Sequence, residues 1–81
     1  MKTAKEMFEE LGYEQLYNNS NYVKYEQIKE FCHIQYTFYV PNYCFEKNAF
    51  VSGDKPEPAP IFSNELKAIN QQCLELGWEE V

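Results

Sequence analysis

The sequence predicts an α+β fold, in which two helices cover one face of an antiparallel sheet of about four strands. Three observations predict it. Each end of the 81-residue chain carries an apolar stripe with helical spacing, and the segment between the ends alternates as strands do. The links between those strands are too short for parallel crossovers, which need about a dozen residues. A chain of this length forms a single domain, residues 1–81.

The first helix is expected over residues 3–11. Thr3 and Glu6 have the spacing of a capping box, in which each side chain accepts from the other's backbone N–H. Gly12 follows as the left-handed stop, after which Tyr13 packs back onto the helix in a Schellman motif. About nine residues are too few for a stable helix in water, so this helix must dock on the sheet.

The strands are expected within residues 13–51. The clearest is 32–40, where apolar residues alternate with more polar ones, and turn formers at 18–21 and 41–42 mark the neighbouring links. Residues 52–60 contain proline at alternate positions, which favours an extended backbone and excludes a helix. We interpret this stretch as a spacer between the sheet and the last helix, with a proline-rich recognition motif as the alternative.

A second helix is expected over residues 63–76, with Ser63 as its N-cap and Gly77 as its stop. The stripe expected to face the sheet consists of Leu66, Ile69, Cys73 and Leu76.

Seven lysines and no arginine stand against thirteen acidic residues, which gives a net charge of −6. That balance argues against direct nucleic-acid binding, because proteins that bind phosphate backbones need clustered basic residues. No apolar run approaches the roughly 18 residues that a membrane span requires, and the first residues lack the apolar stretch of a secretory signal. We therefore expect a cytoplasmic protein that does not contact membranes.

Reactive side chains are few. A zinc site built from the three cysteines and His33 is disfavoured, since adjacent Cys32 and His33 point to opposite faces of a strand. A catalytic pair of His33 with Cys44 or Cys73 stays open at this stage. The three glycines are isolated, so no phosphate-binding loop exists. We expect no enzyme, no metal and no cofactor.

Acidic residues gather where the two helices end. A carboxylate at a helix C-terminus opposes the helix dipole and costs about 0.3–1 kcal/mol when exposed. Such a local cost can mark a surface that steers a basic partner, and a solubilising surface is the alternative. The candidate partner-binding residues are Glu9, Glu10 and Glu14 at the first end and Glu75, Glu79 and Glu80 at the second.

Seven tyrosines are too many for one face of a small sheet to bury. With both helices on one side, the opposite face stays open and presents some of them. Tyrosine offers contact area and a hydrogen-bonding tip at low entropic cost, which is typical of binding surfaces. The candidate residues on this face are His33, Gln35, Thr37 and Tyr39, and the alternative is that a second copy covers the face in a homodimer.

The segments 1–14, 65–72 and 75–78 consist mostly of helix caps and stripe positions. They resemble the opening and the close of a family of small, uncharacterised proteins encoded by phages and prophages of low-GC Gram-positive bacteria. The resemblance implies a shared fold, and it brings no catalytic motif.

These observations together predict a non-enzymatic, phage-encoded binding protein in the host cytoplasm. Its partner would be a host protein with a basic surface, such as a defence or nucleic-acid-handling complex, by analogy with anti-CRISPR-type inhibitors. The alternative is a homo-oligomer with a structural role, or one that sequesters a small ligand by stacking it on tyrosines.

Overall fold

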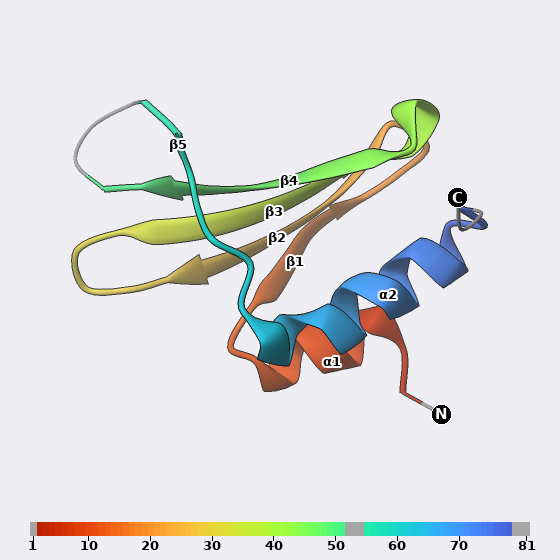
Figure 1. Ribbon diagram of the computed structural model, residues 1–81, viewed down its shortest axis with the longest axis horizontal. Helices are drawn as coiled ribbons and strands as arrows, with labels where there is room; N and C mark the ends of the chain where they lie inside the picture. Colours follow the sequence, from red (N-terminus) through yellow and green to blue (C-terminus); the bar gives the residue numbers. More distant parts are fainter. Residues whose placement is uncertain (1, 52–54, 79–81) are drawn as a thin grey trace.

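Two helices and a five-stranded antiparallel sheet form the fold in the computed structural model, which describes residues 2–51 and 55–78 (Figure 1). The predicted α+β class is confirmed, with five strands in place of about four. Neither helix in these two ranges has the length and apolar character needed to cross a membrane. The elements follow the order α1 (Ala4–Glu10), β1 (Glu14–Asn18), β2 (Tyr22–Ile28), β3 (His33–Tyr39), the 3-10 turn η1 (Val40–Asn42), β4 (Cys44–Phe50), β5 (Glu57–Pro58), the 3-10 turn η2 (Ser63–Glu65) and α2 (Leu66–Glu75).

The sheet is a meander in which each strand pairs with the next one along the chain. Figure 1 shows both helices on the same side of this sheet, as predicted. The helices run in opposite directions, so the start of α1 meets the end of α2, where the Ala4 N–H donates to Glu75 Oε2 at 2.7 Å. The other face of the sheet carries no second layer within the described residues.

Both ends of α1 are formed as predicted. The Glu6 N–H donates to Thr3 Oγ1 at 3.2 Å and the Thr3 N–H donates to Glu6 Oε1 at 3.0 Å, which completes the capping box. Gly12 has a φ of 95°, and the Tyr13 N–H donates to the carbonyl of Phe8 at 2.9 Å. The Tyr13 and Phe8 rings meet edge to face at 5.7 Å, so the Schellman motif also anchors the first residue after the helix in the core.

The beginning of the second helical segment differs from the prediction. Ser63 lies inside η2 and is not the N-cap, because Phe62 occupies that position. The Phe62 N–H donates to Glu65 Oε1 at 3.3 Å, and Glu65 itself is buried. A carboxylate held in the core therefore fixes where this segment starts.

The predicted apolar stripe of α2 is also partly wrong, since Leu66 is 49% exposed. The side of the helix that faces the sheet instead contains two polar residues, Glu65 and Gln72, together with Ala68 and Ile69. Both polar residues accept hydrogen bonds from tyrosine hydroxyls of the core, and this anchoring turns Leu66 outward. The helix ends as predicted at Gly77, whose φ is 74°.

The proline-rich stretch expected as a spacer contains a strand. β5 pairs antiparallel with β4, and the Ala59 N–H that follows it donates to the Lys47 carbonyl at 3.0 Å. Prolines at alternate positions leave the remaining N–H groups free to face β4, while they remove donors from the outer edge. Such an edge resists pairing with another chain. Residues 52–54 of the expected spacer lie outside the described residues.

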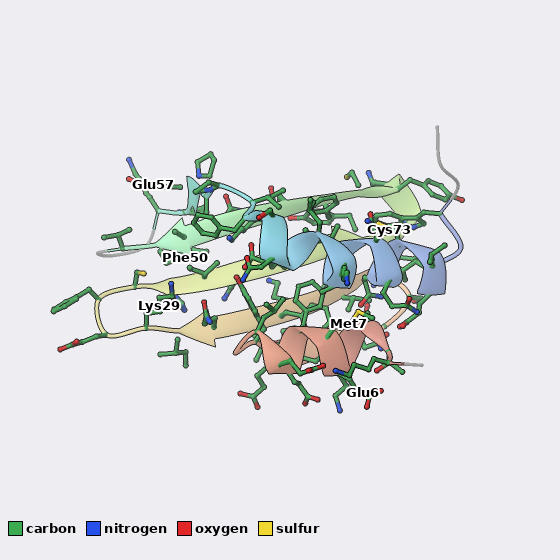
Figure 2. All side chains as sticks on the ribbon, turned by 60° about the horizontal axis from the view of Figure 1, so that its bottom comes forward. Glu6, Met7, Lys29, Phe50, Glu57 and Cys73 are labelled. Atoms are coloured by element: carbon green, nitrogen blue, oxygen red, sulfur yellow. The ribbon has the colours of Figure 1, made fainter. Side chains whose placement is uncertain are left out.

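The core between the sheet and the helices is largely aromatic (Figure 2). Phe8 of α1 stacks on Tyr25 of β2 with ring centroids 4.1 Å apart. The tyrosine hydroxyls in this core all meet polar partners, which is the condition for burying them. The largest fully buried side chains are Phe8, Val23, Tyr25, Tyr36 and Phe38.

Candidate functional site

The open sheet face contains all four residues predicted for it. Residues 34, 36 and 38 of β3 point into the core, so His33, Gln35, Thr37 and Tyr39 point to the face away from the helices. Their neighbours across β2 and β4 share that face, because residues directly opposite in an antiparallel pair lie on the same side.

Three of these four side chains already have partners on the same face. Glu26 Oε2 accepts from Gln35 Nε2 at 2.6 Å and lies 3.2 Å from His33 Nδ1. The Tyr39 hydroxyl donates to Glu46 Oε1 at 2.5 Å, and this hydrogen bond, with burial, raises the pKa of Tyr39 to about 12. The polar centre of the face is therefore an ordered network.

Thr37 offers less contact surface than the prediction assumed, because it is only 7% exposed. It lies directly between Lys24 of β2 and Glu46 of β4, whose longer side chains stand on either side of it. Lys24 and Glu46 belong to the candidate surface although the sequence analysis did not select them. The alternation of β2, with Val23 and Tyr25 inward, was the signal that placed Lys24 on the open face.

Apolar side chains are exposed at the end of the face near the β2–β3 turn. Ile28, His33 and Phe50 form one cross-strand row there, and the Phe50 and His33 rings are 4.8 Å apart. Ile28 is 78% exposed, and Phe31 in the turn is 79% exposed. Figure 2 shows Phe50 and Lys29 at this end of the sheet. The opposite end of the face carries tyrosines, among them Tyr17 and Tyr22 with ring centroids 5.5 Å apart.

The two predicted acidic ends lie at opposite ends of the helical layer, because α1 and α2 are antiparallel. At the first, Glu9 and Glu10 occupy the last turn of α1, which holds no basic residue, and Glu14 begins the edge strand β1. Glu10 pairs with Lys2 at 2.7 Å, and both side chains are more than half exposed. Glu14 lies directly opposite Glu26 of β2, which sets two carboxylates side by side.

The second acidic end has a structural role at the residue that can be described. Glu75 Oε2 accepts from the Ala4 N–H at the start of α1 and from Gln71 Nε2 at 3.0 Å. A carboxylate near the N-terminus of a helix is favourable. The Glu75 charge therefore opposes the dipole of α2 but interacts favourably with the dipole of α1. Glu79 and Glu80 lie outside the described residues.

The arrangement separates the groups that a Cys–His pair would need. His33 and Cys44 lie at opposite ends of neighbouring strands, six residues or roughly 20 Å apart. Cys73 is on α2, on the far side of the sheet from His33, and burial raises the pKa of its thiol. The described residues contain no cluster of three or more groups able to hold a metal ion.

A buried charged cluster, which the sequence analysis missed, joins the sheet to α2. Lys47 Nζ lies 2.7 Å from Glu65 Oε1, and the two side chains are 1% and 7% exposed. The hydroxyls of Tyr13 and Tyr36 donate to the two oxygens of Glu65 at 2.7 and 2.6 Å, and Lys47 also donates to the Pro60 carbonyl at 2.7 Å. The sequence contained evidence for this cluster. Lys47 lies two residues from both Phe45 and Ala49 in β4, so it shares their face of the strand, which points into the core.

Burial raises the pKa of the Glu65 carboxyl, but the hydrogen bonds from Lys47, Tyr36, Tyr13 and the Phe62 N–H lower it by more. The net effect is that the Glu65 carboxyl has a lowered pKa and stays charged at pH values where an ordinary glutamate is already protonated. With every polar atom paired, this cluster serves the fold.

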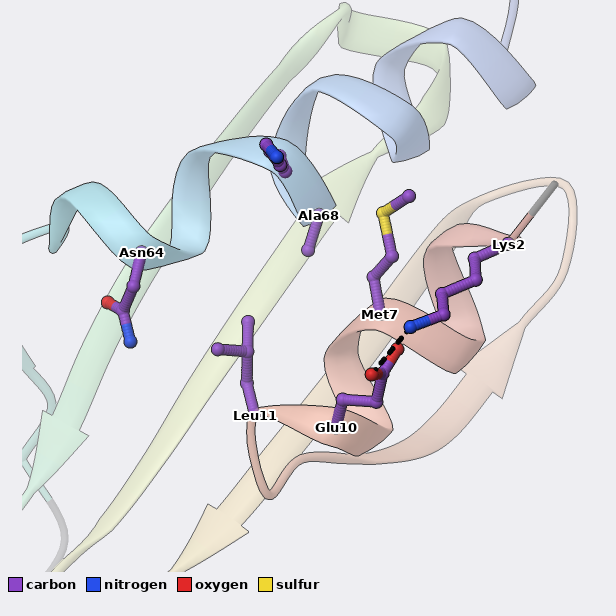
Figure 3. Close-up of a pocket in the computed structure, with 7 residues that line it drawn as sticks. Lys2, Met7, Glu10, Leu11, Asn64 and Ala68 are labelled. Carbon is purple, nitrogen blue, oxygen red and sulfur yellow. Dashed lines mark hydrogen bonds and ion pairs between the residues drawn. The ribbon is translucent and has the colours of Figure 1, made fainter.

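A shallow groove separates α1 from α2 (Figure 3). Met7, Leu11 and Ala68 are its apolar residues, and the Lys2–Glu10 ion pair crosses its rim. The groove is open to solvent along its length and holds no unpaired buried polar group, so it lacks the features of a ligand site.

Comparison with known proteins gave no match: no family model, no curated protein and no solved structure resembles the chain significantly.

Proposed function

We propose that this chain is a non-enzymatic, phage-encoded binding protein that engages a host protein with a basic surface. The contact would be made by the acidic margin, which we define as Glu9, Glu10 and Glu14. Inhibition of a host defence or nucleic-acid-handling complex is the mode of action that this chemistry suits, since carboxylates on a rigid scaffold can occupy a surface that otherwise binds phosphates. The phage origin is proposed from the resemblance of the chain ends alone, since no known family or curated protein matched the chain.

The proposal rests on one observation: the acidic margin holds carboxylates where they cost stability. Glu9 and Glu10 oppose the dipole of α1 with no basic residue in its last turn, and only Glu10 has a nearby cation, the exposed Lys2. Glu14 faces Glu26 across the β1–β2 pair, and like charges directly opposite each other are destabilising. Charges kept at unfavourable positions are typical of functional surfaces.

The test compares two charge-matched variants in affinity capture from infected host cells. Glu9→Gln/Glu14→Gln neutralises the acidic margin, and Glu30→Gln/Glu57→Gln removes the same charge from exposed positions elsewhere. The margin variant should be as stable as the wild type or more so, because it relieves both unfavourable interactions, so a loss of binding cannot be attributed to unfolding.

We expect the captured host protein to bind the margin variant at least 10-fold more weakly in a purified titration, mainly because the variant associates more slowly. The association rate of the wild type should fall as salt is added. The control variant should bind as the wild type does. Equal retention of the partner by both variants, or no partner at physiological salt, would contradict the proposal.

A further inference from the structure

Charged and apolar groups on the open sheet face are arranged in a complementary way about its central strand, β3. Lys24 on one side of Thr37 is matched by Glu46 on the other. The next row has Glu26 on β2 and Asn48 on β4, with Gln35 between them.

The two end rows carry no charged pair. Ile28 on β2 and Phe50 on β4 flank His33 at one end, and Tyr22 and Cys44 flank Tyr39 at the other. No row of β2 and β4 carries the same charge at its two positions. The sheet face is thus complementary to itself when it is turned over about the line of β3.

We propose that this face binds a second copy of the chain, with a two-fold axis that runs along β3 between the two sheets. A two-fold interface uses the same patch on both subunits, so a self-complementary patch is what it requires. Lys24 of each copy then faces Glu46 of the other, and Glu26 faces the amide of Asn48. Each exposed Ile28 packs against Phe50 of the second copy, and the helices remain outside as the outer layers of a four-layer dimer.

The separation of charges within one chain favours pairing between chains. Lys24 and Glu46 stand two strands apart, with their backbones roughly 9–10 Å from each other, and no ion pair joins them among the described residues. Lys24 Nζ lies over the ring of the neighbouring Tyr22, 5.6 Å from its centroid, so the side chain is held on the face. Facing sheets stack about 10 Å apart, which brings such side chains within reach of each other.

The size of the face sets the strength of the contact. The 28 residues of the five strands each cover roughly 3.3 by 4.8 Å of the sheet, which gives a footprint of about 440 Å² in projection per copy. Two copies give about 900 Å² before side-chain relief and the exposed Phe31 are counted, which is close to the lower limit for specific interfaces. Interfaces at this lower limit are typically weak and transient, so we expect a dissociation constant in the micromolar range.

The test is a charge-reversal cycle measured by sedimentation velocity over a range up to about 200 µM at physiological salt. The wild type should form a dimer with micromolar affinity. Lys24→Glu and Glu46→Lys should each weaken it at least 10-fold, because each reversal places like charges opposite each other twice per dimer. The double variant Lys24→Glu/Glu46→Lys should recover the wild-type affinity within about 3-fold, since the pairs are re-formed with exchanged signs.

Two controls carry the same charge changes away from the face: Lys67→Glu on α2 and Glu57→Lys on β5, both exposed. Each should dimerise like the wild type, and circular dichroism should show that every variant is folded. A monomeric wild type at about 200 µM overturns the proposal. So does a double variant that stays as weak as the single reversals, or single reversals that behave like the controls. Glu9 and Glu10 lie on α1, outside this interface, and Glu14 lies at its edge on β1. The Lys24 and Glu46 variants leave all three unchanged, so the proposed function is tested separately.

Discussion

Replacing Lys47 by methionine should remove a large part of the stability of this protein. The substitution keeps an unbranched apolar side chain one atom shorter than lysine and deletes the charge, so Glu65 is left as an uncompensated carboxylate that is 7% exposed. Removing one member of a buried ion pair costs about 3–5 kcal/mol. A domain of 81 residues has a total stability of about 4–12 kcal/mol, so the loss takes between a quarter of it and all of it.

Urea unfolding followed by the fluorescence of Trp78 measures this loss. With a slope of about 1–1.5 kcal/mol per molar urea, the midpoint should fall by roughly 2–5 M. Lys67→Met is the matched control, because Lys67 is exposed on α2, and it should change stability by less than about 0.5 kcal/mol. The double variant Lys47→Met/Glu65→Gln should lose less than Lys47→Met alone, since no charge remains buried in it.

The dependence of stability on pH should become weaker in the Lys47→Met variant. In the wild type the pKa of Glu65 is lowered, so this group contributes stability above the ordinary carboxyl pKa of 4.5 and loses it as the pH falls through the folded value. Without Lys47 the largest of the interactions that lower this pKa is lost while burial still raises it, so the variant should lose less stability than the wild type as the pH falls below 4.5. A Lys47→Met protein that unfolds like the Lys67→Met control, or that keeps the wild-type pH dependence, would refute the role given to this ion pair.

Three further outcomes are expected. Tyr25→Phe should cost about 1–3 kcal/mol in urea unfolding, because the buried carbonyl oxygen of Gln72 loses the hydroxyl that donates to it at 2.5 Å; a neutral effect would mean that water replaces the donor. Gly12→Ala should destabilise more than Gly77→Ala, since both have positive φ but only at Gly12 would the new methyl group approach a side chain of β2, at 2.7 Å; equal losses would show that backbone strain alone sets the cost. Spectrophotometric titration should find Tyr39 ionising near pH 12. The stability that its neutral form contributes is therefore present below about pH 10 and is lost as the pH rises toward 12. Ionisation of Tyr39 near pH 10 in the folded protein would contradict the hydrogen bond assigned to it.

The local features of the fold could be predicted because neighbouring residues determine them. The capping box of Thr3 and the stops at Gly12 and Gly77 depend on side chains and backbone angles within one helical turn. The alternation within β3 likewise follows from the two-residue period of a strand, and it placed His33 and Tyr39 on the open face correctly.

Other features depended on contacts between distant residues. Leu66 was expected to be buried because it is apolar, yet Glu65 next to it lies in the core, since Lys47 and two tyrosine hydroxyls satisfy its carboxylate there. Glu75 was interpreted as a charge that opposes its own helix, whereas the structure brings it to the start of α1, 71 residues away in sequence.

The sequence alone thus determined the class of the fold, both ends of α1, the C-terminal stop of α2 and the side of the sheet on which each residue of β3 lies. The periods of 2 and 3.6 residues and these capping motifs are short-range properties of the chain. Only the tertiary structure decided which polar side chains are buried, that the proline-rich segment adds an edge strand, and that Lys24 and Glu46 stand symmetrically about β3. Those outcomes depend on partners supplied by other strands and helices, and a burial scale that treats each residue by itself contains no information about them.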